Sequence, residues 1–188
     1  MKLFIKNMVC PRCIMSVEQI LKDCNISPKN IILGEVELIK PLSELQLKYL
    51  SKELRKVGFE LLDSKKNRLI EKIKTTLIQK VQQGNIEEHF SLSKYLTQNI
   101  FKEYSTISKL FSEVESITIE QFFILQKIEK VKEWLVYDEL SLGEIALNLG
   151  YSSTQHLSGQ FKKITGMTPT QFKSLGTLPR KPIDSVIK

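Results

Sequence analysis

The chain has 188 residues, of which 41% are hydrophobic and 26% are charged, a balance that excludes a disordered chain and leaves room for one large or two small domains. The first ten residues alternate polar and apolar side chains, so no signal peptide is expected, and no apolar run approaches the roughly 18 residues that span a membrane. We expect a cytoplasmic protein with no membrane partner, in which three cysteines do not indicate a disulfide framework.

The formal charge is +7, and it is distributed unevenly along the chain. Residues 86–144 contain eleven acidic and six basic residues, whereas residues 145–188 contain six basic residues and one acidic residue. A polyanion such as DNA would favour the last segment. The alternative interpretation is that the basic balance only keeps the protein soluble.

Residues 1–64 are predicted to form a small α+β domain. KLFIKNM predicts a strand and PRCIMSVEQILKD a helix, and NIILGEVELI predicts either one bent strand or a hairpin at Gly34. A second helix opens at Ser43 and ends near Gly58, after which FELLD returns as a strand. The order is βαββαβ or βαβαβ, which is compatible with a ferredoxin-like split βαβ sandwich.

Two cysteines stand between the first strand and the first helix, in the stretch MVCPRC. Cys10 would lie in the loop and Cys13 in the first helical turn, with Pro11 near the position that proline favours. The positive end of the helix and Arg12 both stabilise a thiolate, and two nearby soft thiolates suit Cu(I). Cys24 lies about 16 Å further along the helix axis, so it should not complete the site.

The element order, together with Met8-x-Cys10-x-x-Cys13, resembles the heavy-metal-associated domains of copper chaperones and metal-transporting ATPases over residues 1–63. The resemblance implies a ferredoxin-like fold that binds Cu(I) or another soft metal ion at the two cysteines. Asn7 stands where that family usually has glycine. Three interpretations of the pair stay open: a metal site, a thiol redox switch, or a motif left on a domain that now serves dimerisation or another ligand.

The second part of the chain contains an internal repeat with a period of 50 residues, found when residues 91–122 are placed over residues 141–172 without a gap. The positions that coincide include Ser91 with Ser141, Leu92 with Leu142, Ser108 with Ser158, Phe111 with Phe161, Thr118 with Thr168, Gln121 with Gln171, and Phe122 with Phe172. Each copy predicts two short helices joined by a tight turn, which is a helix-turn-helix.

The second helix-turn-helix is predicted over about residues 141–165, with Gly150 in its turn and Ser152 or Ser153 as the next N-cap. The predicted buried stripe of its second helix consists of Leu157, Phe161 and Ile164. In the first copy, predicted over about residues 91–115, the matching stripe consists of Ile107, Leu110, Phe111 and Val114.

The opposite faces of these two helices are predicted to contact DNA. Short polar side chains early in a helix can reach base edges, Gln can pair bidentately with adenine, and lysines further along suit phosphates. In the second copy the residues of this face are Ser153, Thr154, Gln155, Ser158, Gln160, Lys162 and Lys163, and in the first copy they are Tyr104, Ser105, Ser108 and Lys109. Because Glu113 and Glu115 follow in the first copy, we expect the second to supply more of the non-specific affinity.

A long helix is predicted between the two copies, over about residues 118–136. Its rigidity suits two recognition helices that read successive major-groove faces about one DNA turn, roughly 34 Å, apart. Residues 127–173 resemble the C-terminal signature of AraC/XylS-type transcription regulators, with EIA, GYSS, FKK.TG and TPTQF in the order and spacing of that family. The resemblance implies DNA binding through both helix-turn-helix units, in a domain over residues 65–176 that is followed by a tail at 177–188.

One departure from that family concerns Gly159, which stands where the family often has a basic residue. The resemblance therefore implies that one base or phosphate contact is missing at this position. The turn of the first copy also has no glycine and reads NIFKEY instead.

No enzyme is expected, because the chain has no Gly-rich phosphate loop, no nucleophile with a base and an orienting group, and no metal-hydrolase motif. We expect a sequence-specific DNA-binding transcription regulator with a metal or thiol input at its N-terminal domain. Double-stranded DNA is the expected partner, and a homodimer is compatible with a symmetric operator. The alternative is a cytoplasmic copper carrier or thiol redox protein whose helical part is a docking module.

Overall fold

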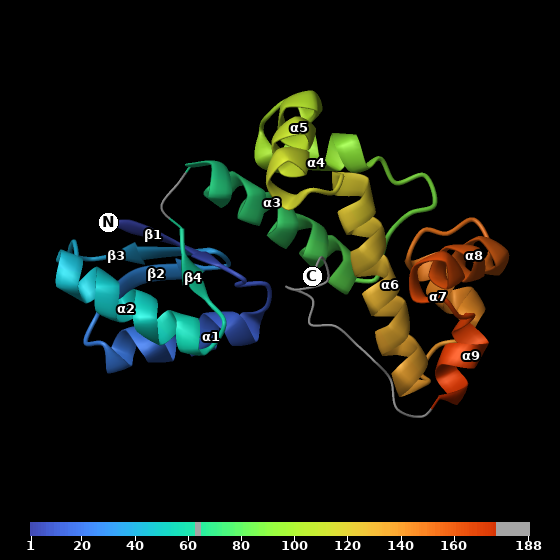
Figure 1. Cartoon of the computed structure of the whole chain (residues 1–188), viewed down its shortest axis with the longest axis horizontal. Helices are drawn as coiled ribbons and strands as arrows, with labels where there is room; N and C mark the ends of the chain where they lie inside the picture. Colours follow the sequence, from blue (N-terminus) through green and yellow to red (C-terminus); the bar gives the residue numbers. More distant parts are fainter. Residues whose placement is uncertain (63–64, 176–188) are drawn as a thin grey trace. The chain divides into compact units, whose positions relative to one another are not determined.

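The computed structural model describes residues 1–62 and 65–175 (Figure 1). The chain divides into two compact units, Met1–Thr76 and Leu77–Lys188, and the boundary between them falls within helix α3 (Lys65–Gln82). The predicted domain boundary after residue 64 stays a prediction. The predicted tail at 177–188 lies outside the described residues.

The first unit combines an antiparallel sheet with helices. Its elements are β1 (Lys2–Lys6), α1 (Pro11–Asp23), β2 (Pro28–Ile32), β3 (Glu35–Leu38), α2 (Glu44–Lys56) and β4 (Glu60–Leu61). The strands pair in the order β2-β3-β1-β4, with every neighbouring pair antiparallel. Gly34 joins β2 to β3 with a positive φ of 79°, which glycine adopts without steric cost. Of the two predicted arrangements of this segment, the hairpin is the one observed.

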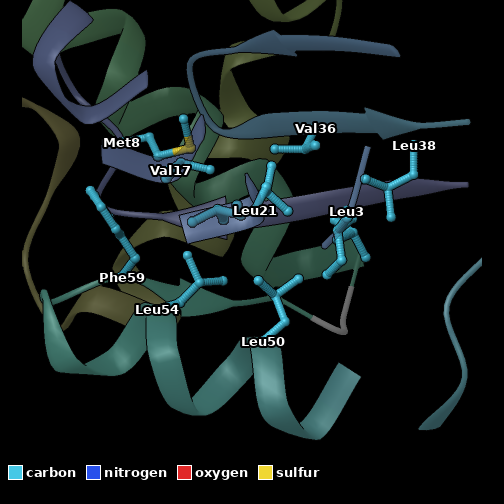
Figure 2. Packing of buried hydrophobic residues seen from close by; sticks show 11 residues of the cluster. Leu3, Met8, Val17, Leu21, Val36, Leu38, Leu50, Leu54 and Phe59 are labelled. Carbon is cyan, nitrogen blue, oxygen red and sulfur yellow. The ribbon is translucent and has the colours of Figure 1, made fainter. Parts of the chain in front are cut away.

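The core of the first unit lies between the sheet and the helices α1 and α2 (Figure 2). Alternation along β1 places Leu3 and Ile5 on the inner face, where their exposed fractions are 6% and 1%. The helices add Val17, Leu21, Leu50 and Leu54, all fully buried. This apolar layer fixes the position of the first turn of α1 relative to β1.

The second unit consists of the end of α3 and the helices α4 (Leu92–Ile100), α5 (Tyr104–Glu115), α6 (Ile119–Tyr137), α7 (Leu142–Asn148), α8 (Thr154–Thr165) and α9 (Pro169–Ser174). Within this unit, α6 lies between the pair α4–α5 and the pair α7–α8 (Figure 1). The bounds of α6 agree closely with the predicted long helix at about 118–136. No helix in the described ranges is long and apolar enough to cross a membrane.

The repeat in the sequence is also a repeat in the structure. The helices α5 and α8 begin 50 residues apart and end 50 residues apart, and so do the starts of α6 and α9. In each copy a buried phenylalanine of the second helix packs on one in the following helix: Phe111 on Phe122 with ring centroids 5.6 Å apart, and Phe161 on Phe172 at 5.4 Å. The two copies therefore share the same aromatic contact.

The same reciprocal cap begins helices α2, α6, α7 and α9. In each, a Ser or Thr hydroxyl accepts a hydrogen bond from the backbone N–H three residues on, and the Gln or Glu at that position accepts one from the N–H of the capping residue. The capping residues are Ser43, Thr118, Ser141 and Thr168. These local bonds satisfy N–H groups that the helix leaves unpaired, and they fix where each helix starts.

The predicted buried stripes are wrong at their last position. Val114 in α5 and Ile164 in α8 are 44% and 37% exposed, although Ile107 and Phe111, and Leu157 and Phe161, are fully buried as predicted. Both exposed residues occupy the last helical turn, immediately before the left-handed residue at which the chain turns away into the next helix. The helical period therefore continues in the sequence beyond the part of each helix that is covered.

The turn of the second copy packs closely against the segment that precedes α4. Gly150 has a φ of +66°, and a Cβ added to it would lie only 2.6 Å from the carbonyl oxygen of Glu87. The backbone N–H of Ile86 donates to the carbonyl of Asn148 at 2.9 Å, and Ile86 pairs with Leu149 in a parallel bridge. Glycine is thus required here both by the backbone conformation and by the close approach.

Candidate nucleic-acid interface

The helix α8 presents a polar face because its other face is firmly packed. Leu157 and Phe161 are fully buried, and helical geometry places Gln155, Lys162 and Lys163 on the opposite, exposed side. Ser153 is the N-cap of α8, with its hydroxyl accepting from the N–H of His156 at 3.1 Å. The side chain of Ser153 is therefore committed to the start of the helix that it was predicted to share with the DNA contacts.

The amide of Gln155 is oriented by its neighbour. The hydroxyl of Thr154, which is half-buried, donates to Oε1 of Gln155 at 3.1 Å. This bond identifies the amide oxygen and leaves both Nε2–H donors directed to solvent, while Oε1 keeps a second lone pair. A donor and an acceptor side by side are what pairing with the N7 and N6 atoms of adenine requires.

Gln160 lies nearer the core and is held from inside the unit. The hydroxyl of Tyr151 donates to Oε1 of Gln160 at 2.6 Å, and the ammonium of Lys127 in α6 lies 3.7 Å from the centroid of the Tyr151 ring. Burial raises the pKa of Tyr151, so its hydroxyl stays protonated and keeps this donor role. Gln160 is left with its Nε2–H donors, and Ser158 beside it is half-buried.

The first copy presents a weaker version of this face. In α5, Ser105 and Lys109 are exposed and Ser108 is half-buried. The hydroxyl of Tyr104 donates to the carboxylate of Glu120 at the start of α6, and burial together with this bond raises the Tyr104 pKa. The Tyr104 hydroxyl is therefore engaged within the unit.

The interior partners of the predicted face were missed by sequence reasoning. Lys127 and Tyr151 lie 24 residues apart on different elements, so no local pattern connects them. The same holds for Tyr104 and Glu120, which are joined only through the packing of α5 on α6. A polar residue at the edge of an amphipathic helix is the one signal that marks such positions.

The two cysteines lie where the sequence predicts, at the start of α1. Cys10 is the N-cap of α1 and Pro11 occupies the first turn, while the Sγ atoms of Cys10 and Cys13 are 3.3 Å apart. Burial opposes ionisation of Cys10, but hydrogen bonds from the Cys13 thiol and from the backbone N–H groups of Cys13 and Arg12 outweigh it and lower the Cys10 pKa. Burial raises the pKa of Cys13. The pair therefore contains one thiol that ionises more readily than the other.

The surroundings of the pair limit its ligand set. The side chain of Met8 is 1% exposed and points into the core (Figure 2), and Cys24 lies at the C-cap of α1, at the other end of the helix. Among residues 1–62 and 65–175, no group of three or more His, Cys, Asp or Glu side chains is placed to hold a metal ion. The described residues thus offer a site of two thiols, a donor set that fits a soft ion such as Cu(I).

Asn7 explains how this loop forms without the glycine expected there. Its φ is +70°, in the left-handed region that asparagine tolerates better than other side chains. Its Nδ2 donates to the carbonyl oxygen of Gly58 at 2.8 Å. The loop thus keeps a left-handed residue and gains a bond to the end of α2.

Residues 89–174 match the family described as "Helix-turn-helix domain". This part of the chain is therefore a helix-turn-helix domain of the AraC type, which confirms the predicted class for this segment.

The curated relatives of the chain are transcription regulators. An uncharacterized HTH-type transcriptional regulator from Staphylococcus aureus is 35% identical over 92 residues, which are 47% of this chain and 12% of that regulator. The probable transcriptional regulator LumQ from Photobacterium leiognathi is 25% identical over 120 residues, which are 64% of this chain and 47% of LumQ. The chain thus spans less than half the length of either relative.

Among solved structures, the DNA-binding domain of AdpA, determined in complex with a target DNA, is similar to 55% of this chain. The similarity covers 90% of the AdpA chain, with a TM-score of 0.48 and 16% sequence identity.

Proposed function

We propose that the protein is a sequence-specific DNA-binding transcription regulator, with α8 as its main recognition helix. The observation that carries the proposal is the exposed face of α8, where an oriented Gln155 is followed one turn or two later by Lys162 and Lys163. This order places a base-reading amide ahead of phosphate-binding ammonium groups on one face. The residue roles are proposals, and so is the use of duplex DNA as the partner.

We also assign α5 to DNA contact, as the recognition helix of the first copy. The 19 residues of α6 give it a length of about 28 Å at 1.5 Å per residue, which is close to one turn of DNA. Of the predicted contacts in α5, Ser105 and Lys109 have exposed side chains, whereas Glu113 adds an exposed negative charge. The first copy is therefore expected to contribute less affinity than the second, and a homodimer stays a prediction.

Gln155→Ala is expected to reduce selectivity for DNA. A bidentate glutamine contributes about 1–3 kcal/mol of discrimination between base pairs, so the variant should lose most of its preference for a selected site while its affinity for random DNA changes little. The measurement is a gel shift with the full chain, comparing a site selected from random-sequence DNA with unselected DNA.

Lys162→Ala is the matched control on the same face of α8. Loss of one phosphate contact should weaken binding to both DNAs and lower the slope of log K against log salt by about 0.9. If Gln155→Ala weakens both DNAs equally, the assignment of the base-reading position is wrong. The alternative role as a copper carrier or thiol redox protein predicts no selective retention of DNA by the wild type at physiological salt.

We propose in addition that the first unit carries an input at its cysteine pair. The strand order β2-β3-β1-β4 with helices after β1 and β3 supports the ferredoxin-like assignment. The 3.3 Å separation of the Sγ atoms supports joint action of Cys10 and Cys13 on one soft ion. Cu(I) held there would link the loop to the first turn of α1 through two thiolate bonds.

A Cu(I) titration with a competing thiol tests this input. The wild type and Cys24→Ser are expected to retain Cu(I), whereas the double variant Cys10→Ser/Cys13→Ser should lose it, because only the paired thiols are close enough to share an ion. Equal retention by the double variant, or none by the wild type, would rule out the metal input.

A further inference from the structure

Gly159 lies at the centre of the exposed face of α8. It follows Gln155 by one turn and precedes Lys162 and Lys163 by about one turn, so all four share the side of the helix opposite Leu157. Among the described residues, no heavy atom lies within 4 Å of the position that a Cβ on Gly159 would occupy. The middle of the proposed reading surface is therefore bare backbone.

The fold gives no reason for a glycine at this position. Gly150 and Gly166 have positive φ angles, and Gly84 packs against the ring of Trp134, but Gly159 has neither a positive φ nor a close neighbour among the described atoms. In a helix interior, glycine is among the least favourable residues and alanine the most favourable. Residue 109, the counterpart in α5, is an exposed lysine, so this place in the repeat accepts a long side chain.

An explanation outside the chain lies in the depth at which α8 can enter a groove. A helix with its side chains is about 10–12 Å across, and the major groove is about 12 Å wide and 8.5 Å deep, so the side chains decide how far the backbone enters. The residues beside Gly159 are short, because Ser158 carries only a hydroxyl and Thr154 is bonded to Gln155. Short side chains reach base edges only if the backbone comes close.

We propose that Gly159 is the point where the backbone of α8 meets the base edges of duplex DNA, and that its missing side chain sets the depth of α8 in the major groove. This inference rests on the proposed function and adds a specificity-determining residue to it. The ligand is the major-groove edge of the base pair that faces Gly159. A side chain there would hold Gln155 and Ser158 away from their bases.

The test compares glycine substitutions in the same unit. Gly159→Ala adds one methyl group to the reading face, whereas Gly143→Ala is a matched control in α7, where a Cβ would have only one neighbour among the described residues, at 3.9 Å. Gly159→Arg adds length and a positive charge, and a charge by itself would strengthen DNA binding. Each full-length variant is measured by gel shift on a site selected by the wild type from random DNA, and on unselected DNA.

Gly159→Ala is expected to raise the Kd for the selected site about tenfold, which corresponds to about 1.4 kcal/mol, and to leave the Kd for unselected DNA unchanged. Gly143→Ala should leave both values unchanged. Gly159→Arg should bind the selected site more weakly than the wild type despite its charge. Thermal unfolding of Gly159→Ala should occur at or slightly above the wild-type temperature, because alanine favours the helix.

The inference is overturned if Gly159→Ala binds the selected site like the wild type, if Gly159→Arg binds it more tightly, or if Gly159→Ala lowers the unfolding temperature and so shows that the fold needs this glycine. In each of these outcomes the proposed function stands, because the wild type has selected a site. If the wild type enriches no sequence, the proposed function fails, and this inference fails with it.

Discussion

Replacing Gly150 with alanine is expected to lower the free energy of unfolding of the second unit by about 3 kcal/mol. The new Cβ would meet the carbonyl oxygens of Glu87 and Ile86 at 2.6 and 3.0 Å, and the residue would have to keep a φ of +66°. Relief of the clash requires residues 86–87 to move away from α7, which breaks the bond from Ile86 N–H to the Asn148 carbonyl.

Trp134 provides the measurement, because it is the single tryptophan of the chain and lies in the second unit. Urea unfolding followed by its fluorescence reports the stability of that unit in the full-length protein. Gly166→Ala is the matched control, since Gly166 has a φ of +83° but no described atom within 4 Å of its added Cβ. It should cost only about 1 kcal/mol. Equal losses in the two variants would show that the contact with residues 86–87 contributes nothing.

The second large effect is a gain in stability, expected for Lys127→Met. Lys127 is 9% exposed, and burial lowers its pKa from 10.5 to about 8. At about 1.4 kcal/mol per unit of pKa, keeping this lysine charged at pH 7 costs about 3 kcal/mol. The face of the Tyr151 ring offsets about 1 kcal/mol of that cost. Methionine, of similar shape and without charge, should therefore raise the free energy of unfolding by about 2 kcal/mol at pH 7.

The gain should depend on pH in a defined direction. Unfolded Lys127 keeps its proton up to about pH 10.5, whereas in the folded protein it loses the proton near pH 8. Between these values the unfolded state binds more protons, so the wild type becomes more stable as the pH rises. The advantage of Lys127→Met is thus full below pH 8 and shrinks toward pH 10.5, as urea unfolding at pH 7 and pH 10 would show.

Lys132→Met is the control with the opposite sign. Lys132 is also 9% exposed, but its ammonium lies 2.6 Å from Oε1 of Glu129. Removing one member of a buried ion pair destabilises a protein by about 3 kcal/mol, because the remaining charge loses a partner. A gain in both variants would mean that burial of the lysine stem, and not the charge, decides the result.

The helices of the second unit could be predicted well because their signals are local. Thr118 and Thr168 each stand three residues before a glutamine, and this spacing defines a helix start within a single turn. The repeat then transfers one assignment to the other copy, 50 residues away. The exposed face of α8 could also be predicted, since the helical period places Gln155 opposite Leu157.

The remaining features depend on contacts between distant residues. The approach of Ile86 to Leu149 and the contact of Lys127 with Tyr151 join segments that no periodic pattern relates. The same limit accounts for the exposure of Val114 and Ile164, because the end of a packed region is set by the neighbouring helix. In the first unit, the cysteine loop could be placed from MVCPRC, but the bond from Asn7 to Gly58 required the fold of both helices.

The helix α6 belongs to both copies of the repeat. It starts as the third helix of the first copy, in the place that α9 holds in the second, and continues for 19 residues where α9 ends after six. For a protein that reads DNA with α5 and α8, the distance between the two contacts is then a property of the polypeptide. The binding sites of such a protein can diverge in base sequence, but evolution can alter their spacing only by changing the protein as well.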